Sequence, residues 1–129
     1  MTEAEQGGYP RQVVIDAYGN GGFRFEGISH RGSLLCLPSG MQAWPITRPD
    51  EVTLASLAPL LEEADRMDVL FIGLGSDIVR LDPAIPAAFR ERGVIVEAIA
   101  TGGAVRTYTV LLAEDRAVGA ALIAVDRVR

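Results

Sequence analysis

The sequence predicts a single α/β domain with a mixed sheet, because three unbroken apolar runs alternate with segments of helical periodicity. The runs cover residues 69–72, 94–99 and 118–125. The first is closed by Gly73, as expected for a central strand that helices cover on both faces. A length of 129 residues suits one domain. We therefore expect a compact domain over residues 13–129, preceded by a flexible polar tail at residues 1–12.

The N-terminal half has the pattern of short strands separated by turns. Gly19-Asn20-Gly21-Gly22 supplies the positive-φ positions that a hairpin needs, and Phe23 and Phe25 then share one face. Predicted strands cover residues 13–15, 28–31, 33–37 and 41–44. We expect these strands to form one compact antiparallel sheet, which gives the first half an α+β character.

Two helices flank the run at residues 69–72. The first places Leu57, Leu60, Leu61 and Ala64 at helical spacing. Because a helix tolerates proline only in its first turn, Pro59 places the start near Ser56 as N-cap, and not at Thr53. The second helix opens at Asp82-Pro83 and ends at Gly93.

A buried strand at residues 94–99 follows, and then a third helix capped by Thr101. Strand-forming residues such as Val105 and Thr107 lie in this segment, but they do not alternate apolar with polar, so a helix is preferred. Its apolar stripe consists of Ala104, Tyr108, Leu111 and Leu112. The last strand, at residues 118–125, completes the order helix, strand, helix, strand, helix, strand.

The strongest candidate for a site is the edge where the strands at residues 69–73 and 94–99 end. A strand-helix-strand crossover makes the two strands parallel, so their following loops leave together. Open α/β sheets bind ligands at such an edge. The candidate ligand-binding residues are Gly73, Gly75, Ser76 and Asp77 in the first loop, and Thr101, Gly102, Gly103 and Arg106 in the second.

This crevice would suit a small anion such as a phosphate or carboxylate. We expect the amides of Gly75, Ser76, Gly102 and Gly103 to face it, with Arg106 as a bidentate donor and Asp77 as an opposing charge. The alternative is that the glycines only make tight turns. The first loop lacks both the G-x-G-x-x-G spacing and the lysine of a P-loop.

Composition excludes several classes of function. The net charge is −5 and argues against nucleic-acid binding. All twelve basic residues are arginine, which excludes Schiff-base and Walker-lysine chemistry. The apolar runs are shorter than the roughly 20 residues of a membrane span, and residues 1–8 lack the features of a signal peptide. We expect a cytoplasmic protein with no membrane insertion.

No catalytic or metal-binding pattern is present in the sequence. Ser76 is outside a G-x-S-x-G elbow, and His30 is the only histidine, so a hydrolase triad is not expected. Cys36 lies among leucines and is predicted to be a buried hydrophobic residue. One histidine, one cysteine and scattered carboxylates show no metal-ligand spacing. We expect no metal, no cofactor and no enzymatic activity.

Three further side chains are predicted to have structural roles. Glu97 interrupts an apolar run, so it should either point to the exposed end of the sheet or find a partner, for which Arg80 and Arg106 are the candidates. A structural ion pair is favoured over an acid-base role. Trp44 and Tyr18 should cover the edge of the core, and the alternative is that they are exposed and belong to a partner interface.

Several of these residues together resemble a known family. The resemblance covers most of residues 13–125, and its longest block is residues 93–123. It rests on that block and on Gly73-Leu74-Gly75-Ser76, Leu81-x-Pro83, Tyr18-Gly19, Phe23, Gly32-Ser33 and Trp44. The chain is similar to the small α/β domain family that includes mitochondrial complex I assembly factor 3 and the adipogenesis-associated domain protein.

The resemblance implies a β-rich first half and a role as a non-enzymatic interaction or assembly factor with a protein partner. It carries over no catalytic residues. Relatives show Thr-Tyr-Asn where this chain has Thr107-Tyr108-Thr109, and the chain lacks a mitochondrial targeting segment. These features favour a bacterial, cytoplasmic member. The alternative function is a domain that binds small anions at the crevice described above.

Overall fold

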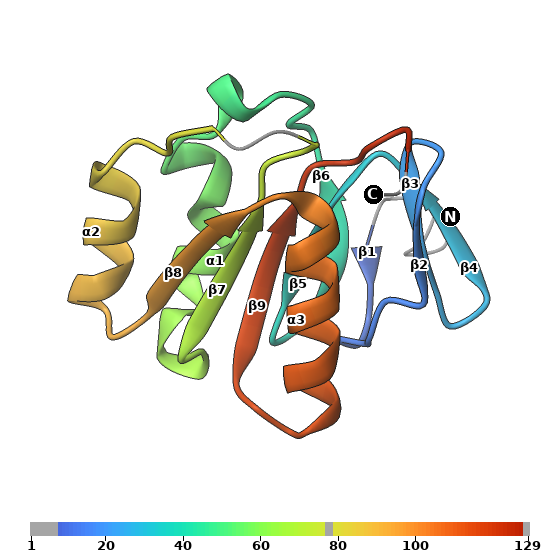
Figure 1. Ribbon diagram of the computed structural model, residues 1–129. Helices are drawn as coiled ribbons and strands as arrows, with labels where there is room; N and C mark the ends of the chain where they lie inside the picture. The colour runs from blue at the N-terminus through green and yellow to red at the C-terminus, as the bar shows by residue number, and fades with distance from the viewer. Residues whose placement is uncertain (1–7, 77–78, 128–129) are drawn as a thin grey trace.

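A computed structural model describes residues 8–76 and 79–127 of the chain. Its strands and helices follow one another as shown in Figure 1. The strands are β1 Gly8–Tyr9, β2 Ala17–Gly19, β3 Gly22–Phe25, β4 Ile28–Arg31, β5 Ser33–Leu37, β6 Gly40–Trp44, β7 Val69–Gly73, β8 Ile95–Ile99 and β9 Val118–Leu122. The α-helices are α1 Ala58–Glu62, α2 Ala84–Glu91 and α3 Thr101–Ala113. Single 3-10 turns lie at Pro49–Glu51, Ala55–Leu57 and Ala64–Arg66.

The six-stranded sheet is mixed, as predicted. Its order is β1-β6-β5-β9-β7-β8. β7 is parallel to both β8 and β9, whereas β5 is antiparallel to β9 and β6. The predicted parallel pairing of residues 69–73 with residues 94–99 is therefore confirmed. β7 has a strand on each side, but β5 and β9 occupy the middle of the sheet.

The N-terminal half differs from its prediction, because its strands divide between two sheets. β2, β3 and β4 form a separate three-stranded sheet, while β5 and β6 join the large one. Figure 1 shows the small sheet at the side of the molecule, beyond β1. All five residues of β5 are buried, and Leu34 pairs with Leu122 of β9. β5 thus buries more apolar surface beside β9 than it could at the edge of a small antiparallel sheet.

The segment at residues 13–15 is not a strand, because its backbone bonds to side chains of α3. The Tyr108 hydroxyl donates to the Val13 carbonyl oxygen at 2.8 Å, and the Ile15 N–H donates to Thr109 Oγ1 at 3.2 Å. The strand that follows this segment, β2, begins at Ala17. Within the predicted tail, residues 1–7 lie outside the described residues, whereas Gly8–Tyr9 pairs with β6. Ordered structure therefore begins earlier in the chain than the sequence predicted.

The helices form where they were expected, but the cap of the first helix differs. Thr53 Oγ1 accepts from the Ser56 N–H at 3.0 Å, and Ser56 Oγ accepts from the Thr53 N–H at 2.9 Å. This reciprocal pair caps the first turn at Thr53, so the assignment of Ser56 as the N-cap was wrong. Asp82 Oδ1 accepts from the Ala84 N–H at the start of α2, as predicted, and that helix ends just before Gly93.

Helices cover both faces of the large sheet, so the core has two halves. Along β5, Leu35 and Leu37 pack on the side of α1 and α2, whereas Leu34 and Cys36 pack on the side of α3. The alternation is the period-two side-chain pattern of a strand buried on both faces. We call these halves the α1/α2 core and the α3 core.

β8 is the exception to the prediction of buried strands. It is the edge strand of the sheet, and Ile95 is 65% exposed. Glu97 is also exposed, and none of the ion pairs found among the described residues includes it, so the expected pair with Arg80 or Arg106 is wrong. An exposed carboxylate needs no partner because water solvates it.

Trp44, His30 and Cys36 are buried, and of these the burial of Cys36 and the packing of Trp44 against the core were predicted. Trp44 is 3% exposed, and its indole N–H donates to the Ser56 carbonyl oxygen at 2.8 Å. His30 Nε2 donates to the Ser33 carbonyl oxygen, and the Tyr9 hydroxyl bonds to His30 Nδ1 at 2.8 Å. Burial raises the pKa of the Cys36 thiol to about 12, which keeps it protonated and unreactive at neutral pH.

Candidate functional site

The two glycine-rich loops that follow β7 and β8 lie against each other and are joined by backbone hydrogen bonds. The Leu74 N–H donates to the Ile99 carbonyl oxygen at 2.8 Å, and the Thr101 N–H donates to the Gly75 carbonyl oxygen at 2.9 Å. Parallel strands end at the same edge, so this contact follows from the topology predicted from the sequence. We call the two joined loops beside the start of α3 the ledge.

Thr101 joins the loops and is not the predicted helix cap. The N-cap is Ala100, in an extended conformation, and Thr101 is the first helical residue. The Thr101 hydroxyl is completely buried; it accepts from the Gly75 N–H at 3.0 Å and donates to the Ile123 carbonyl oxygen at 2.7 Å. One side chain therefore ties together the segments after β7, β8 and β9.

Gly73 has a packing role, because no side chain fits at its position. A Cβ there would lie 2.9 Å from Thr101 Cα and 3.1 Å from a methyl carbon of Leu122. The two loops can approach each other only because this position has no side chain. Gly73 and Thr101 thus hold the two loops of the ledge together, and neither residue lines its open surface.

A cavity of about 180 Å³ opens above this ledge. Five of the eight predicted residues line it: Gly75, Ser76, Gly102, Gly103 and Arg106. Its remaining lining comes from Ala100, Tyr18, Val125 and Arg127. Asp77 lies outside the described residues. The cavity therefore lies between the two predicted loops, and the binding of a ligand there stays a prediction.

The amides available in this cavity differ from the predicted set. The Gly75 N–H already donates to Thr101 Oγ1, so it cannot also bind a ligand without breaking that bond. The N–H groups of Gly102 and Gly103 belong to the first turn of α3, where amides have no partner within the helix. The Arg106 side chain lies over the same turn, 3.4 Å from the position that a Gly102 Cβ would occupy.

Sequence reasoning missed the residues that complete the cavity from distant segments. Tyr18 comes from β2, and a Cβ at Gly102 would overlap its hydroxyl oxygen. Val125 and Arg127 follow β9. Arg127 brings a second guanidinium to a cavity in which only Arg106 was expected. No local pattern links these positions, since they meet only through the packing of the two sheets.

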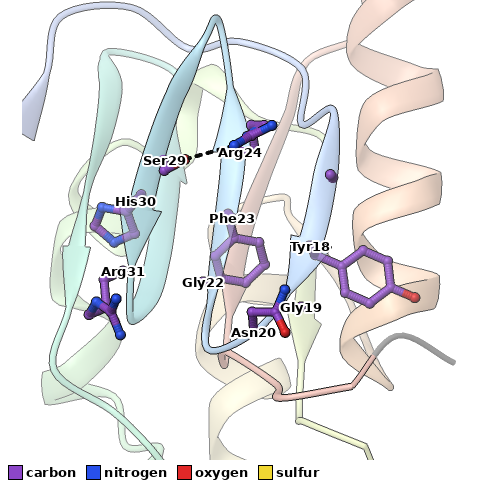
Figure 2. A pocket seen from close by; sticks show the side chains of 10 residues that line it. Tyr18, Gly19, Asn20, Gly22, Phe23, Arg24, Ser29, His30 and Arg31 are labelled. Carbon is purple, nitrogen blue, oxygen red and sulfur yellow. Dashed lines mark hydrogen bonds between the residues drawn. The ribbon is translucent and has the colours of Figure 1, made fainter.

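A larger hollow of about 410 Å³ lies on the small sheet and was not predicted at all (Figure 2). Arg24 of β3 and Arg31 of β4 line it, and the rest of its lining comes from the same three strands and the turn between β2 and β3: Ala17, Tyr18, Gly19, Asn20, Gly22, Phe23, Ser29 and His30. Figure 2 shows Arg24 beside Ser29 toward one end of the hollow and Arg31 toward the other. The Arg24 guanidinium donates to Ser29 Oγ at 3.4 Å.

Metal-binding and membrane-spanning features were searched over residues 8–76 and 79–127. Within these ranges no group of three or more histidine, cysteine or acidic side chains is placed to hold a metal ion. None of the helices described there is long and apolar enough to cross a bilayer.

Comparison with known sequences identifies related proteins. Residues 15–123 match the model of a family described as a protein of unknown function, DUF498/DUF598. An uncharacterized protein of Rhodobacter capsulatus is 39% identical over 116 residues, which cover 90% of this chain and 88% of that protein. The mouse NADH dehydrogenase [ubiquinone] 1 alpha subcomplex assembly factor 3 is 32% identical over 118 residues, or 92% of this chain. The match spans only 64% of the mouse protein's length.

Solved structures share the fold. A crystal structure named as an outer membrane protein from Bartonella henselae has a TM-score of 0.86 and 47% sequence identity, covering 91% of this chain and 98% of that one. The predicted α/β fold and the resemblance to the assembly factor family are both confirmed by these matches.

Proposed function

This chain belongs to the DUF498 family of proteins of unknown function, and on that basis we propose that it is a non-enzymatic interaction or assembly factor. The observation that carries the proposal is its similarity to NADH dehydrogenase [ubiquinone] 1 alpha subcomplex assembly factor 3 over nearly the whole of this chain. The partner would be a protein, and the expected location is the bacterial cytoplasm. Because one fold can serve unrelated functions, the partner need not be the one that its mitochondrial relatives bind.

The proposal is tested by capture of a partner from the native cell. The full chain with an affinity tag should recover one protein in near-equal amount, absent from an untagged strain, and the two purified proteins should bind in calorimetry. Recovery of no stable partner, together with turnover of a substrate in a broad activity screen, would contradict the proposal.

A second candidate function is the binding of a small anion in the cavity at the ends of β7 and β8. The observation that favours it is that Arg106 and Arg127 line one cavity of about 180 Å³ beside the first turn of α3. Cations at a helix N-terminus suit a phosphate or carboxylate. Both arginines are exposed, so the expected affinity is weak.

Titration of inorganic phosphate, nucleotides and small carboxylates should move the backbone amide resonances of Ser76, Gly102 and Gly103 together and saturably. Arg106→Ala should weaken this binding about two- to fivefold, as expected for an exposed ion pair. Arg90→Ala, at the far end of α2, is the control and should leave it unchanged. If the three amides do not move at millimolar ligand in a well-folded sample, the glycines only make turns.

A further inference from the structure

The outer face of the β2-β3-β4 sheet is hollow because its central positions carry almost no side-chain bulk. Cross-strand pairing places Ala17 opposite Arg24 and Gly19 opposite Gly22. On this face the middle of the hollow therefore consists of backbone atoms and the Ala17 methyl group. Its long side chains, Arg24 and Arg31, lie only toward its two ends. This explains a volume of about 410 Å³ on the face of a sheet of only three strands.

Both long side chains on this face are arginines. Arg24 lies opposite Ser29, and Arg31 is two residues further along β4, so the two are diagonal neighbours. Diagonal neighbours on adjacent strands have Cα atoms about 7–8 Å apart. Two guanidinium groups of one face can thus reach a single ligand (Figure 2).

The charge of these arginines is not neutralised by nearby carboxylates. No acidic residue lines the hollow, and neither Arg24 nor Arg31 takes part in the ion pairs found among the described residues. Acidic side chains near the small sheet lie outside this lining: Glu26 binds Arg11 at 2.9 Å, Asp16 accepts from the Glu26 N–H, and Asp126 Oδ1 lies 3.8 Å from the position of a Cβ at Gly21. In a chain with a net charge of −5, a local positive surface of this kind indicates an acidic ligand.

We infer that this face binds an acidic, extended segment of a partner protein. Successive side chains on one side of an extended peptide are about 6.5–7 Å apart, close to the spacing of Arg24 and Arg31. Carboxylates two residues apart in such a segment would each meet one guanidinium. A polypeptide suits the face better than a small ion, because the hollow is wide, its arginines are exposed, and a single ion would stay largely hydrated there.

This inference rests on the proposed interaction function and identifies the chemistry of the partner. The test uses a terminally blocked peptide of three Glu-Ser repeats, with a Gln-Ser peptide of equal length as control. Each is titrated into ¹⁵N-labelled full-length protein. The Glu-Ser peptide should shift the amides of Arg24, Ser29 and Arg31 saturably, and the Gln-Ser peptide should not.

Matched variants assign the effect to the two arginines. Arg24→Gln with Arg31→Gln should weaken binding about fivefold to tenfold, the loss expected for two exposed ion pairs. Arg90→Gln with Arg92→Gln removes the same charge from exposed positions at the end of α2 and should bind like the wild type. The amide spectrum of each variant shows whether it is folded.

Three results would overturn the inference. These are equal shifts from both peptides, unchanged binding by the Arg24 and Arg31 double variant, and inorganic pyrophosphate matching the Glu-Ser peptide in both affinity and shift pattern. The last would assign the face to small anions. If the wild-type protein captures no partner from cells and turns over a substrate in the activity screen, the proposed function fails, whereas the peptide titration still decides the chemistry of this face.

Discussion

Replacement of Tyr108 by alanine is expected to lower the free energy of unfolding by about 3–5 kcal/mol, as typical of a large aromatic residue lost from a core. Tyr108 is 0% exposed and packs in the α3 core. Its hydroxyl donates a hydrogen bond to the Val13 carbonyl oxygen at 2.8 Å, and burial raises the pKa of this hydroxyl. The substitution therefore creates a cavity and also releases the segment at residues 13–15 from α3.

Chemical denaturation of three variants separates these contributions. Tyr108→Phe keeps the ring and should cost about 1–2 kcal/mol, because the partly buried Val13 carbonyl loses its donor. Thr107→Ala, at an exposed position of the same helix, should change stability by at most about 0.5 kcal/mol. A loss below about 1 kcal/mol in Tyr108→Ala would show that α3 does not depend on this residue.

Replacement of Thr101 by valine is expected to cost about 2–4 kcal/mol. Valine has nearly the same shape but no hydroxyl, so the Gly75 N–H and the Ile123 carbonyl oxygen both lose the partner that Thr101 provides. Each buried group left without a partner costs about 1–3 kcal/mol. The amide of Gly75 should also exchange with solvent faster, because the hydrogen bond that protects it is gone.

The same substitution at Thr107 gives a matched control. Thr107 lies on α3 and is exposed, so Thr107→Val should leave stability nearly unchanged. Thr101→Ser keeps the hydroxyl and should retain most of the lost stability. Thr101→Val with wild-type stability and unchanged exchange at Gly75 would mean that the loops are held by their backbone bonds alone.

Thr101 and the loops that it joins show how far sequence reasoning reached at the candidate site. The expectation that two glycine-rich loops meet at one edge was correct, because it follows from parallel strands joined by a helix. The role assigned to Thr101 was wrong. A threonine before a helix is normally read as a cap, and nothing in the local sequence shows that the Ile123 carbonyl lies within reach of its hydroxyl.

The apolar runs at β7 and β9 and the helical periodicity between them determined the fold class by themselves. Their pattern is local, and burial on both faces of a strand is visible as an unbroken hydrophobic segment. Cys36 and Trp44 were placed correctly for the same reason. The helix over residues 101–113 was also found, since its strand-forming residues lacked the alternation of a strand.

Only the tertiary structure decided which strands became neighbours. The short strands of the N-terminal half have similar patterns, yet β5 and β6 join the large sheet while β2, β3 and β4 form their own. The pattern of β8 suggested burial, but its place at the sheet edge exposes Ile95. Pairing depends on the total apolar surface that each arrangement buries, which is a property of the whole chain. For the same reason, the closeness of Arg24 and Arg31 on one face became visible only when their strands were paired.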